Sequence, residues 1–184
     1  MKGLIILGDS FEDTEALSST DVLIRAGEQI TRASVMSSLD VLSQCKVHVK
    51  ADISIDDVKE SDYDYLIIPG GKASFTILNK DVRVEKLIDE FLAKGKLVAT
   101  ICAAPHLLSR KGYFANRQFT CHPGFETYAA AGTYRRDLGV YRDDKFVTAK
   151  SMYYSIPFGL EIIAFLYGEN RRDEVEKQLM GEGR

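Results

Sequence analysis

Short apolar runs rich in β-branched residues alternate with helix-like stretches along this chain. The clearest runs are Lys2–Leu7, Tyr65–Ile68, Leu97–Ile101 and Phe146–Ala149, and we expect each to form a strand. Strands that alternate with helices build a mainly parallel sheet with helices on both faces. The sequence therefore predicts an α/β fold whose ligand sites lie outside the carboxyl ends of the strands.

Turn residues bound the other expected elements. Gly27 closes the first helix at a position that needs a positive φ, Lys94-Gly95 ends another helix, and Asp143-Asp144 marks a turn between two late strands. Further strands are expected at Glu28–Val35, Val47–Ala51, Phe119–Cys121 and Gly139–Tyr141, and helices at Thr14–Ala26, Val82–Ala93, Ala103–Leu108, Pro157–Tyr167 and Arg172–Met180. No linker or repeat interrupts this order, so we expect a single domain over residues 1–184.

Composition excludes several classes of protein. With 184 residues, of which 45% are apolar, the chain can bury its own core, and its formal net charge is −3. Charges of both signs are mixed, with only short basic pairs such as Arg135-Arg136, so we expect no nucleic-acid partner. The apolar run Leu4–Leu7 is too short for a membrane span or a signal peptide, so we expect no membrane association and a cytoplasmic location.

The cysteines also limit the possibilities. Cys45, Cys102 and Cys121 are odd in number and lack the paired spacing of a zinc site. A disulfide framework and a structural metal are therefore disfavoured, and we expect three free thiols.

Cys102 stands where the strand Leu97–Ile101 gives way to a helix through Ala103-Ala104. A sharp turn of this kind leaves the turn residue exposed at the carboxyl edge of the sheet, where a helix N-terminus favours a thiolate. A cysteine at a strand end is also a common small apolar filler of the core. The local pattern leaves both interpretations open.

Two other strand ends carry polar or flexible residues. Glu12, Asp13 and Glu15 follow the first strand, and Pro69-Gly70-Gly71 follows the strand Tyr65–Ile68. The glycine pair offers unobstructed N–H groups to an oxyanion, although the same sequence often makes only a tight turn. Glu15 held beside a thiol in a partly dry pocket would have a raised pKa and could act as an acid and base, whereas its ordinary role is that of a solvated residue in a first helical turn.

Three segments together resemble a known family. Phe11–Glu15, Ile68–Gly71 and Ala99–Pro105, in this order and spacing, are similar to the ThiJ/PfpI superfamily, and most of all to the subgroup of the parkinsonism-associated deglycase and its bacterial relatives. The resemblance covers almost the whole chain. It implies a flavodoxin-like three-layer sandwich with a nucleophile elbow, a homodimer, and no cofactor or metal.

The resemblance also implies roles for individual residues. Cys102 matches the family nucleophile, Glu15 the carboxyl that bonds its sulfur, and His122 the nearby histidine, although a histidine before Pro123 is as readily an ordinary loop residue. Gly70, Gly71 and Ala103 match backbone positions around an anion pocket. Arg25 matches an arginine near the pocket and the dimer contact, and by itself is an ordinary cation at a helix end.

The chain departs from the family pattern at several positions. Ala103 replaces the histidine of the protease-like members, so a PfpI-type protease or amidase is disfavoured. Gln44-Cys45 stands where relatives carry a Ser-Arg pair, and Ser151-Met152-Tyr153 where they carry Gly-Pro-Gly. We expect Met152 and Tyr153 to narrow the rim of the pocket. Cys121 is a candidate to resolve a sulfenic acid on Cys102.

Two functions from different classes remain. In the first, Cys102 and Glu15 serve a cofactor-independent enzyme of the glyoxalase III or deglycase type, which acts on reactive α-oxoaldehydes such as methylglyoxal or on their early adducts with amines and thiols. In the second, the same thiol is an oxidant sensor that controls a protective or chaperone function. Repeated turnover distinguishes an enzyme from a sensor.

Overall fold

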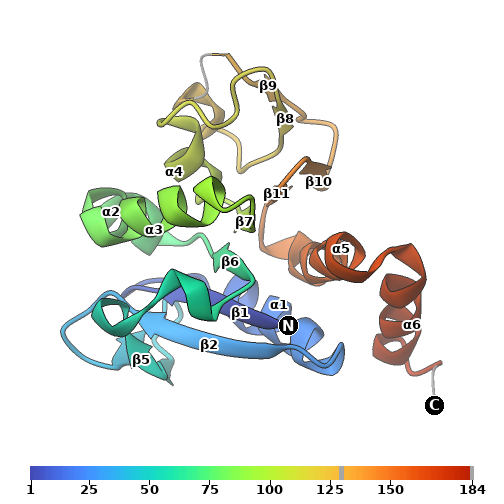
Figure 1. Cartoon of the computed structure of the whole chain (residues 1–184), viewed down its shortest axis with the longest axis horizontal. Coiled ribbons are helices and arrows are strands. Elements are labelled where there is room, and N and C mark those ends of the chain that lie inside the picture. The colour runs from blue at the N-terminus through green and yellow to red at the C-terminus, as the bar shows by residue number, and fades with distance from the viewer. Residues whose placement is uncertain (129–130, 183–184) are drawn as a thin grey trace.

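A seven-stranded sheet runs through the middle of the molecule (Figure 1). The computed structural model describes residues 1–128 and 131–182. The sheet has the order β10-β11-β7-β6-β1-β2-β5, and every neighbouring pair is parallel except β10 and β11. Its strands are β1 (Lys2–Leu7), β2 (Gln29–Ser34), β5 (Ile53–Ser54), β6 (Tyr65–Ile68), β7 (Leu97–Ile101), β10 (Val140–Asp143) and β11 (Phe146–Ala149).

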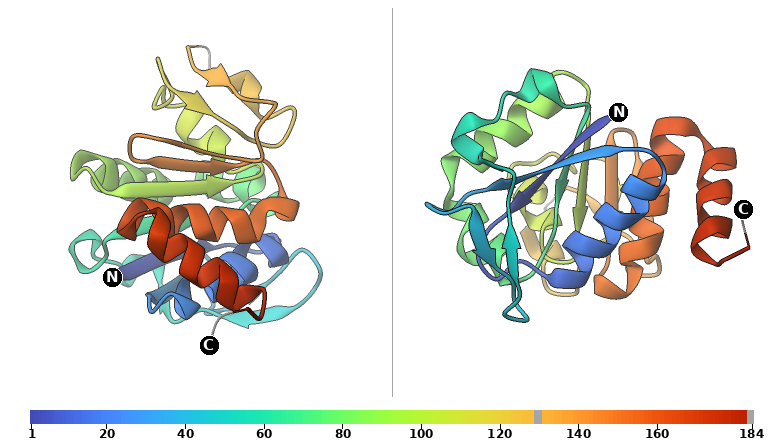
Figure 2. Two further views of the ribbon diagram at one scale, coloured as in Figure 1. Left: turned by 90° about the vertical axis from the view of Figure 1, so that its right-hand side faces the viewer. Right: turned by 90° about the horizontal axis from the view of Figure 1, so that it is seen from below.

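Helices cover both faces of the sheet (Figure 2). On one face α1 packs against α5, and α5 against α6, while α2, α3 and α4 lie on the other face. The α-helices are α1 (Asp13–Arg25), α2 (Lys72–Thr76), α3 (Val82–Ala93), α4 (Pro105–Ser109), α5 (Ser155–Tyr167) and α6 (Glu169–Leu179). This is the three-layer α/β sandwich that the sequence predicts. None of the helices in the described ranges has the length and apolarity needed to span a bilayer.

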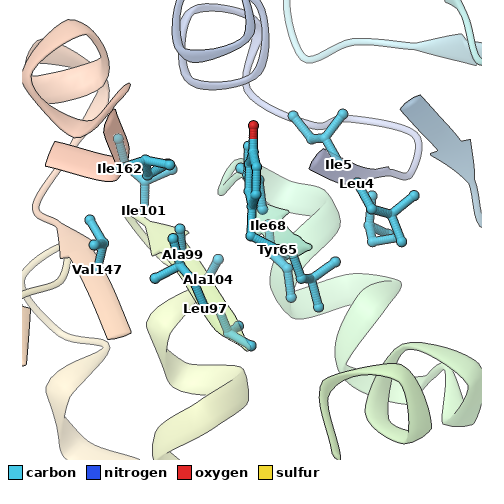
Figure 3. Close-up of a cluster of buried hydrophobic side chains, with 14 of the residues drawn as sticks. Leu4, Ile5, Tyr65, Ile68, Leu97, Ala99, Ile101, Ala104, Val147 and Ile162 are labelled. Carbon is cyan, nitrogen blue, oxygen red and sulfur yellow. The ribbon is translucent and has the colours of Figure 1, made fainter. Parts of the chain in front are cut away.

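The central strands are buried on both faces, which explains why they are continuously apolar rather than alternating. All residues of β6 and β7 are buried, and Leu4, Ile5, Tyr65 and Ile101 lie in the cluster that fills the space between sheet and helices (Figure 3). The ends of these strands are consequently held rigidly, and the loops that leave them begin from fixed positions.

Short elements complete the chain. Two small pairs of strands lie outside the main sheet. One is the antiparallel hairpin of β3 (Asp40–Leu42) and β4 (His48–Lys50), and the other is the parallel pair of β8 (Gln118–Phe119) and β9 (Thr133–Tyr134). The 3-10 helices are η1 (Ile55–Asp57), η2 (Glu60–Asp62), η3 (Leu78–Lys80), η4 (Glu126–Tyr128) and η5 (Met152–Tyr154). The β3–β4 hairpin is tied to the β1–α1 loop, because Ser10 N donates to Leu42 O at 2.7 Å and Gln44 N donates to Phe11 O at 2.8 Å.

The expected elements are found, with differences at their ends. The four clearest strands and the helix Val82–Ala93 have the bounds expected from the sequence, and Gly27 has a φ of +95°. The strand expected at Phe119–Cys121 ends before Cys121, and the helix expected from Ala103 begins at Pro105. The expected turn at Asp143-Asp144 is shifted, because Asp143 pairs with Phe146 as the last residue of β10 and Asp144 takes a φ of +52°.

Candidate active site

Cys102 forms a strained turn between β7 and α4. Its φ is +62°, a conformation that a residue with a side chain adopts only at a cost of about 1–3 kcal/mol. Two hydrogen bonds hold it there: Cys102 N donates to Ala149 O at 2.8 Å, and Cys102 O accepts from His122 N at 2.8 Å. The half-buried thiol thus lies at the carboxyl edge of the sheet, as the elbow interpretation of the sequence predicts.

Glu15 reaches the same edge from the first turn of α1. Its side chain is fully buried, and its Oε2 accepts a hydrogen bond from Gly70 N at 2.8 Å. Its backbone N–H donates to the Glu12 carboxylate, which caps the helix, at 2.7 Å. The other oxygen, Oε1, is buried without a hydrogen-bond partner in the described part of the chain, so it remains available to the Cys102 thiol or to a substrate hydroxyl.

Burial and their mutual contact shift the pKa values of Cys102 and Glu15. Burial, with the nearby Glu12 charge as a further cause, raises the pKa of Glu15 to about 7. Burial and the Glu15 carboxylate also raise the pKa of the Cys102 thiol, against the N–H groups of Ala103 and Gly71, which lower it. The helix N-terminus gives little support to a thiolate here, because α4 is a single short turn that begins three residues later, and burial beside Glu15 opposes ionisation of the thiol. Glu15 is the neighbouring group that can exchange a proton with Cys102.

Two glycines permit this close packing. A Cβ on Gly70 would lie 2.7 Å from Glu15 Oε2 and 2.8 Å from Cys102 Cβ, so a side chain there would separate the pair. Gly71 has a φ of +80°, and a Cβ on it would lie 2.4 Å from Glu12 N. The Pro69-Gly70-Gly71 turn is thus a structural requirement of the site as well as a source of N–H groups.

A cavity of about 310 Å³ opens in front of Cys102. Loops from the ends of β1, β6, β7 and β11 meet there with the β3–β4 hairpin, at the point where the order of the sheet reverses between β1 and β6. Its walls are formed by Glu12, Glu15, Gln44, Gly71, Lys72, Phe75, Cys102, Ala103, His122, Phe125, Ser151 and Met152.

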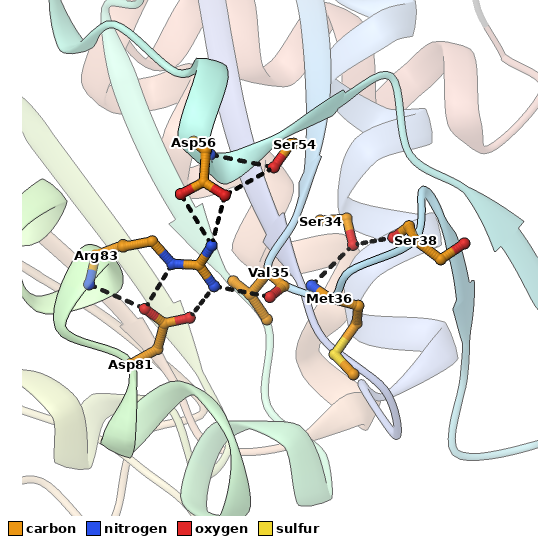
Figure 4. A network of polar contacts seen from close by, with 8 residues as sticks. All are labelled: Ser34, Val35, Met36, Ser38, Ser54, Asp56, Asp81 and Arg83. Atoms are coloured by element: carbon orange, nitrogen blue, oxygen red, sulfur yellow. Dashed lines mark hydrogen bonds and ion pairs between the residues drawn. The ribbon is translucent and has the colours of Figure 1, made fainter.

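A larger cavity, of about 620 Å³, lies at the ends of β2 and β5. Its arginine, Arg83, is held by Asp56, by Asp81 and by Val35 O at 2.8 Å (Figure 4). Its lining carries no cysteine or histidine. The smaller cavity is therefore the candidate active site, because a cysteine and a buried carboxyl converge there.

The structure brings most of the expected site residues together. Cys102, Glu15, Gly71, Ala103, His122 and Met152 line the cavity, and Gly70 lies directly behind it. His122 binds the elbow through its backbone N–H, while its ring Nδ1 lies 3.0 Å from Pro123 O. Because a carbonyl only accepts, Nδ1 carries the hydrogen there and Nε2 is the nitrogen that remains for other partners.

Two expected rim residues lie elsewhere. Arg25 is at the far end of α1, exposed, where its Nε is 2.8 Å from the Asp21 carboxylate. Tyr153 is 82% exposed and packs against Tyr154 rather than lining the cavity. Of the two large side chains expected to narrow the rim, only Met152 lines the cavity.

Sequence reasoning did not find the rest of the cavity wall. Gln44 reaches it because its Oε1 accepts a hydrogen bond from Lys72 N at 3.2 Å, a contact between a hairpin and a helix that no local pattern encodes. Phe75 and Phe125 lie four residues after Gly71 and three after His122. Their closeness to those two motifs is the only signal in the sequence that could have identified them.

The other cysteines do not support the Cys102 site. All three thiols are free, as expected. Burial raises the pKa of Cys121 to about 12 and the side chain belongs to the hydrophobic core, which makes it unsuited to resolve a sulfenic acid by thiolate attack. Cys45 is exposed, and the Asp13 carboxylate raises its pKa. Among the residues that the structure describes, no group of three or more His, Cys, Asp or Glu side chains is placed to bind a metal ion.

The fold and site define a class: a flavodoxin-like sandwich that presents a cysteine on a strained elbow at the switch point of its sheet, next to a buried carboxyl. The model of the DJ-1/PfpI family matches residues 1–165, and the chain belongs to that family.

Similar proteins cover the chain almost end to end. Protein dj-1beta of Drosophila melanogaster is 28% identical over 178 residues, 96% of this chain and 95% of its own. The glutathione-independent glyoxalase DJR-1.2 of Caenorhabditis elegans is 29% identical, over 96% of this chain and 94% of its own. The structure of oxidized Toxoplasma gondii DJ-1 superposes with a TM-score of 0.90 at 31% identity and covers 97% of both chains.

Proposed function

We propose that this protein is a cofactor-independent enzyme that converts reactive α-oxoaldehydes, such as methylglyoxal, to 2-hydroxy acids. The observation that carries the proposal is the contact between a nucleophilic cysteine on an elbow and a buried carboxyl whose pKa lies near 7, both in the wall of one cavity. The name of the C. elegans relative, a glutathione-independent glyoxalase, supports the same chemistry.

The reaction begins with addition of the thiol to the aldehyde. As Cys102 Sγ bonds to the aldehyde carbon, Glu15 takes the thiol proton and passes it to the aldehyde oxygen, which gives a hemithioacetal. A raised pKa suits Glu15 to this exchange near neutral pH, because neither of its protonation states is strongly favoured. The N–H groups of Gly71 and Ala103 lie beside the sulfur and stabilise negative charge that develops there.

Proton transfer between adjacent carbons completes the oxidation of one and the reduction of the other. Glu15 removes the hydrogen of the former aldehyde carbon as a proton, and an enediol forms. Protonation of the neighbouring carbon then leaves a thioester on Cys102 together with a new secondary alcohol. Water hydrolyses the thioester to the 2-hydroxy acid and frees the thiol, so no external oxidant or reductant is needed.

Early adducts of these aldehydes with amines and thiols form a second substrate group within the same proposal. Such an adduct carries the same two-carbon unit, and attack by Cys102 would release the amine or thiol as leaving group. This deglycase activity requires the same Cys102–Glu15 pair. We place the reaction in the cytoplasm, with a small-molecule substrate.

We further propose that the chain works as a homodimer. Exposed apolar side chains gather on α1 and α5, where Leu17, Ile24 and Ile156 are 42%, 51% and 49% exposed. Leu17 and Ile156 line one shallow hollow with Val22 and Leu179. A second copy of the chain would cover this surface.

The test is steady-state consumption of methylglyoxal without glutathione, with lactate measured directly and Cys102→Ser alongside. We expect many molecules of lactate per enzyme and none above background in the variant. Fewer than about one aldehyde consumed per thiol, or equal turnover by Cys102→Ser, would reject the proposal.

One observation favours a second function. The N–H groups of Gly71 and Ala103 beside Sγ would equally stabilise a cysteine sulfinate, and the T. gondii structure shows that a relative exists in oxidized form. In this alternative the protein is an oxidant sensor or redox-regulated chaperone. Conversion of Cys102 to the sulfinate by peroxide, together with no aldehyde turnover, would favour it over the enzyme.

A further inference from the structure

Two phenylalanine rings form part of the cavity wall near Cys102. Phe75 comes from α2 and Phe125 from the loop after His122, and their centroids lie 5.4 Å apart at an angle of 43°. Phe125 also lies 5.7 Å from the His106 ring and 6.2 Å from the His122 ring, so it is held among aromatic neighbours. Phe75 is 38% exposed, and it therefore keeps apolar surface that a ligand could cover.

The cavity is larger than a three-carbon aldehyde requires. Its volume of about 310 Å³ falls at the lower end of the ~300–1000 Å³ that hold drug-sized ligands. Methylglyoxal on Cys102 would occupy only part of this volume. A substituent that reached Phe75 and Phe125 would bury apolar surface of their rings.

Burial at the base of the cavity disfavours charged groups. Glu12, Glu15 and the exposed Lys72 line the cavity, and burial raises the pKa of both carboxyls because removal from water opposes their charged forms. A flat neutral ring satisfies this condition, and it can meet Phe75 and Phe125 in the offset or edge-to-face arrangements that aromatic pairs prefer.

We propose that the preferred substrates are α-oxoaldehydes that carry an aromatic ring, and that Phe75 and Phe125 select them. This inference rests on the proposed function, which it narrows to a substrate class. The reacting carbon bonds to Cys102, and the ring of the substrate packs on the Phe75–Phe125 wall. The reaction is the one given above, with a 2-aryl-2-hydroxy acid as product.

The decisive comparison is kcat/KM for phenylglyoxal, cyclohexylglyoxal and methylglyoxal. We expect the wild type to prefer phenylglyoxal over methylglyoxal by at least about tenfold, the scale that a buried ring and an aromatic contact provide. Phe75→Ala should reduce this preference by about tenfold, mainly through KM. Phe75→Leu, which keeps apolar volume, should retain cyclohexylglyoxal activity and lose much of the advantage of the aromatic substrate.

Tyr153→Ala is the matched control. It removes an exposed aromatic ring close in sequence to Met152 but outside the cavity wall, and we expect it to leave the substrate ratio unchanged. Circular dichroism and thermal unfolding establish that each variant is folded. Because Phe75 is partly exposed, we expect its variants to remain folded.

A binding experiment separates this inference from the proposed function. Protection of Cys102 from alkylation is measured with 2-hydroxyacetophenone and with hydroxyacetone, neutral analogues that lack the aldehyde. Stronger protection by the aromatic analogue, lost in Phe75→Ala, supports aromatic selection even if turnover fails. Equal protection, or a phenylglyoxal to methylglyoxal ratio that Phe75→Ala leaves unchanged, overturns it while methylglyoxal turnover still supports the enzyme.

Discussion

At the scale of single residues, the site keeps a carboxyl in a place that is unfavourable for a carboxylate. Glu15 is fully buried, next to a thiol and near the Glu12 carboxylate. Cys102 adds a strained φ of +62° in the adjacent turn. Both features lower stability and both create reactivity, which is the usual relation between a stable fold and an active site.

Substitution of Glu15 should reveal its cost to stability. Because the pKa of Glu15 is raised from 4.5 to about 7 on folding, its contribution to stability is fully present below pH 4.5 and is lost as the pH rises through 7. Glu15→Gln keeps an acceptor for Gly70 N and has no charge. We expect it to be more stable than the wild type at pH 8 by up to about 3 kcal/mol.

The measurement is urea unfolding of both proteins from pH 4 to pH 8. The difference between their free energies of unfolding should be smallest at pH 4 and should grow between pH 4.5 and 7. A difference that does not change with pH would mean that Glu15 has an ordinary pKa.

Gly71 allows a prediction about steric fit. Its backbone is in the left-handed region and a Cβ would lie within 3 Å of three backbone atoms, whereas Gly27, with a φ of +95°, has nothing within 4 Å of its Cβ position. Gly27→Ala should therefore cost about 1–2 kcal/mol from φ alone. Gly71→Ala should cost more and should abolish activity. Equal losses in chemical denaturation would show that the contacts are unimportant.

At the scale of secondary-structure elements, the first turn of α1 affects the pKa of Glu15 beside Cys102. Glu12 caps the helix through the Glu15 N–H, and its charge contributes to the raised pKa of Glu15. Glu12→Gln keeps a capping oxygen and removes the charge. We expect it to shift the pH midpoint associated with Glu15 downward.

Asp13→Asn is the comparison for Glu12→Gln. Asp13 also lies in the first turn of α1, but its side chain accepts from Cys45 N at 3.0 Å, away from Glu15. The midpoint should stay in place in this variant, as seen in the pH dependence of kcat/KM. A similar shift in both variants would assign the effect to the general charge of the helix end.

The sequence predicted the strands and helices that have a regular apolar pattern. It did not predict the very short strands or the contacts between residues far apart in the chain. The buried strands and the helix Val82–Ala93 have strong apolar patterns, and their bounds were predicted correctly. The strands β3, β5 and β9 have two or three residues each, fewer than any periodicity needs. Gln44 lines the cavity through a tertiary contact that no local pattern encodes, and only its closeness to His122 in the sequence could have indicated Phe125. The raised pKa of Cys102 was missed because it depends on burial beside Glu15.

At the scale of the whole molecule, the order of the strands creates the site. Chain segments that follow β1, β6 and β7 supply Glu15, Gly70 and Cys102, and the sheet places these three strands side by side. The rigid core behind them fixes the distances within the site.

If the chain is a dimer, a charge introduced on the proposed interface should dissociate it, whereas a charge introduced elsewhere on the surface should not. Ile156→Glu, on the exposed apolar surface of α5, should shift the protein from dimer to monomer in light scattering coupled to size exclusion. Val82→Glu, at a position 76% exposed on the opposite side of the sheet, should leave the dimer intact. A monomeric wild type would contradict the proposed assembly.

The account as a whole depends on Glu15 as the base that takes the proton of Cys102. The most direct test is the pH dependence of kcat/KM for methylglyoxal between pH 5.5 and 8.5, with lactate followed. The account predicts a rate that rises through about pH 7, as Glu15 becomes a carboxylate, and then levels off. A rate that is flat over this range, or that rises only where an ordinary thiol ionises, would contradict it.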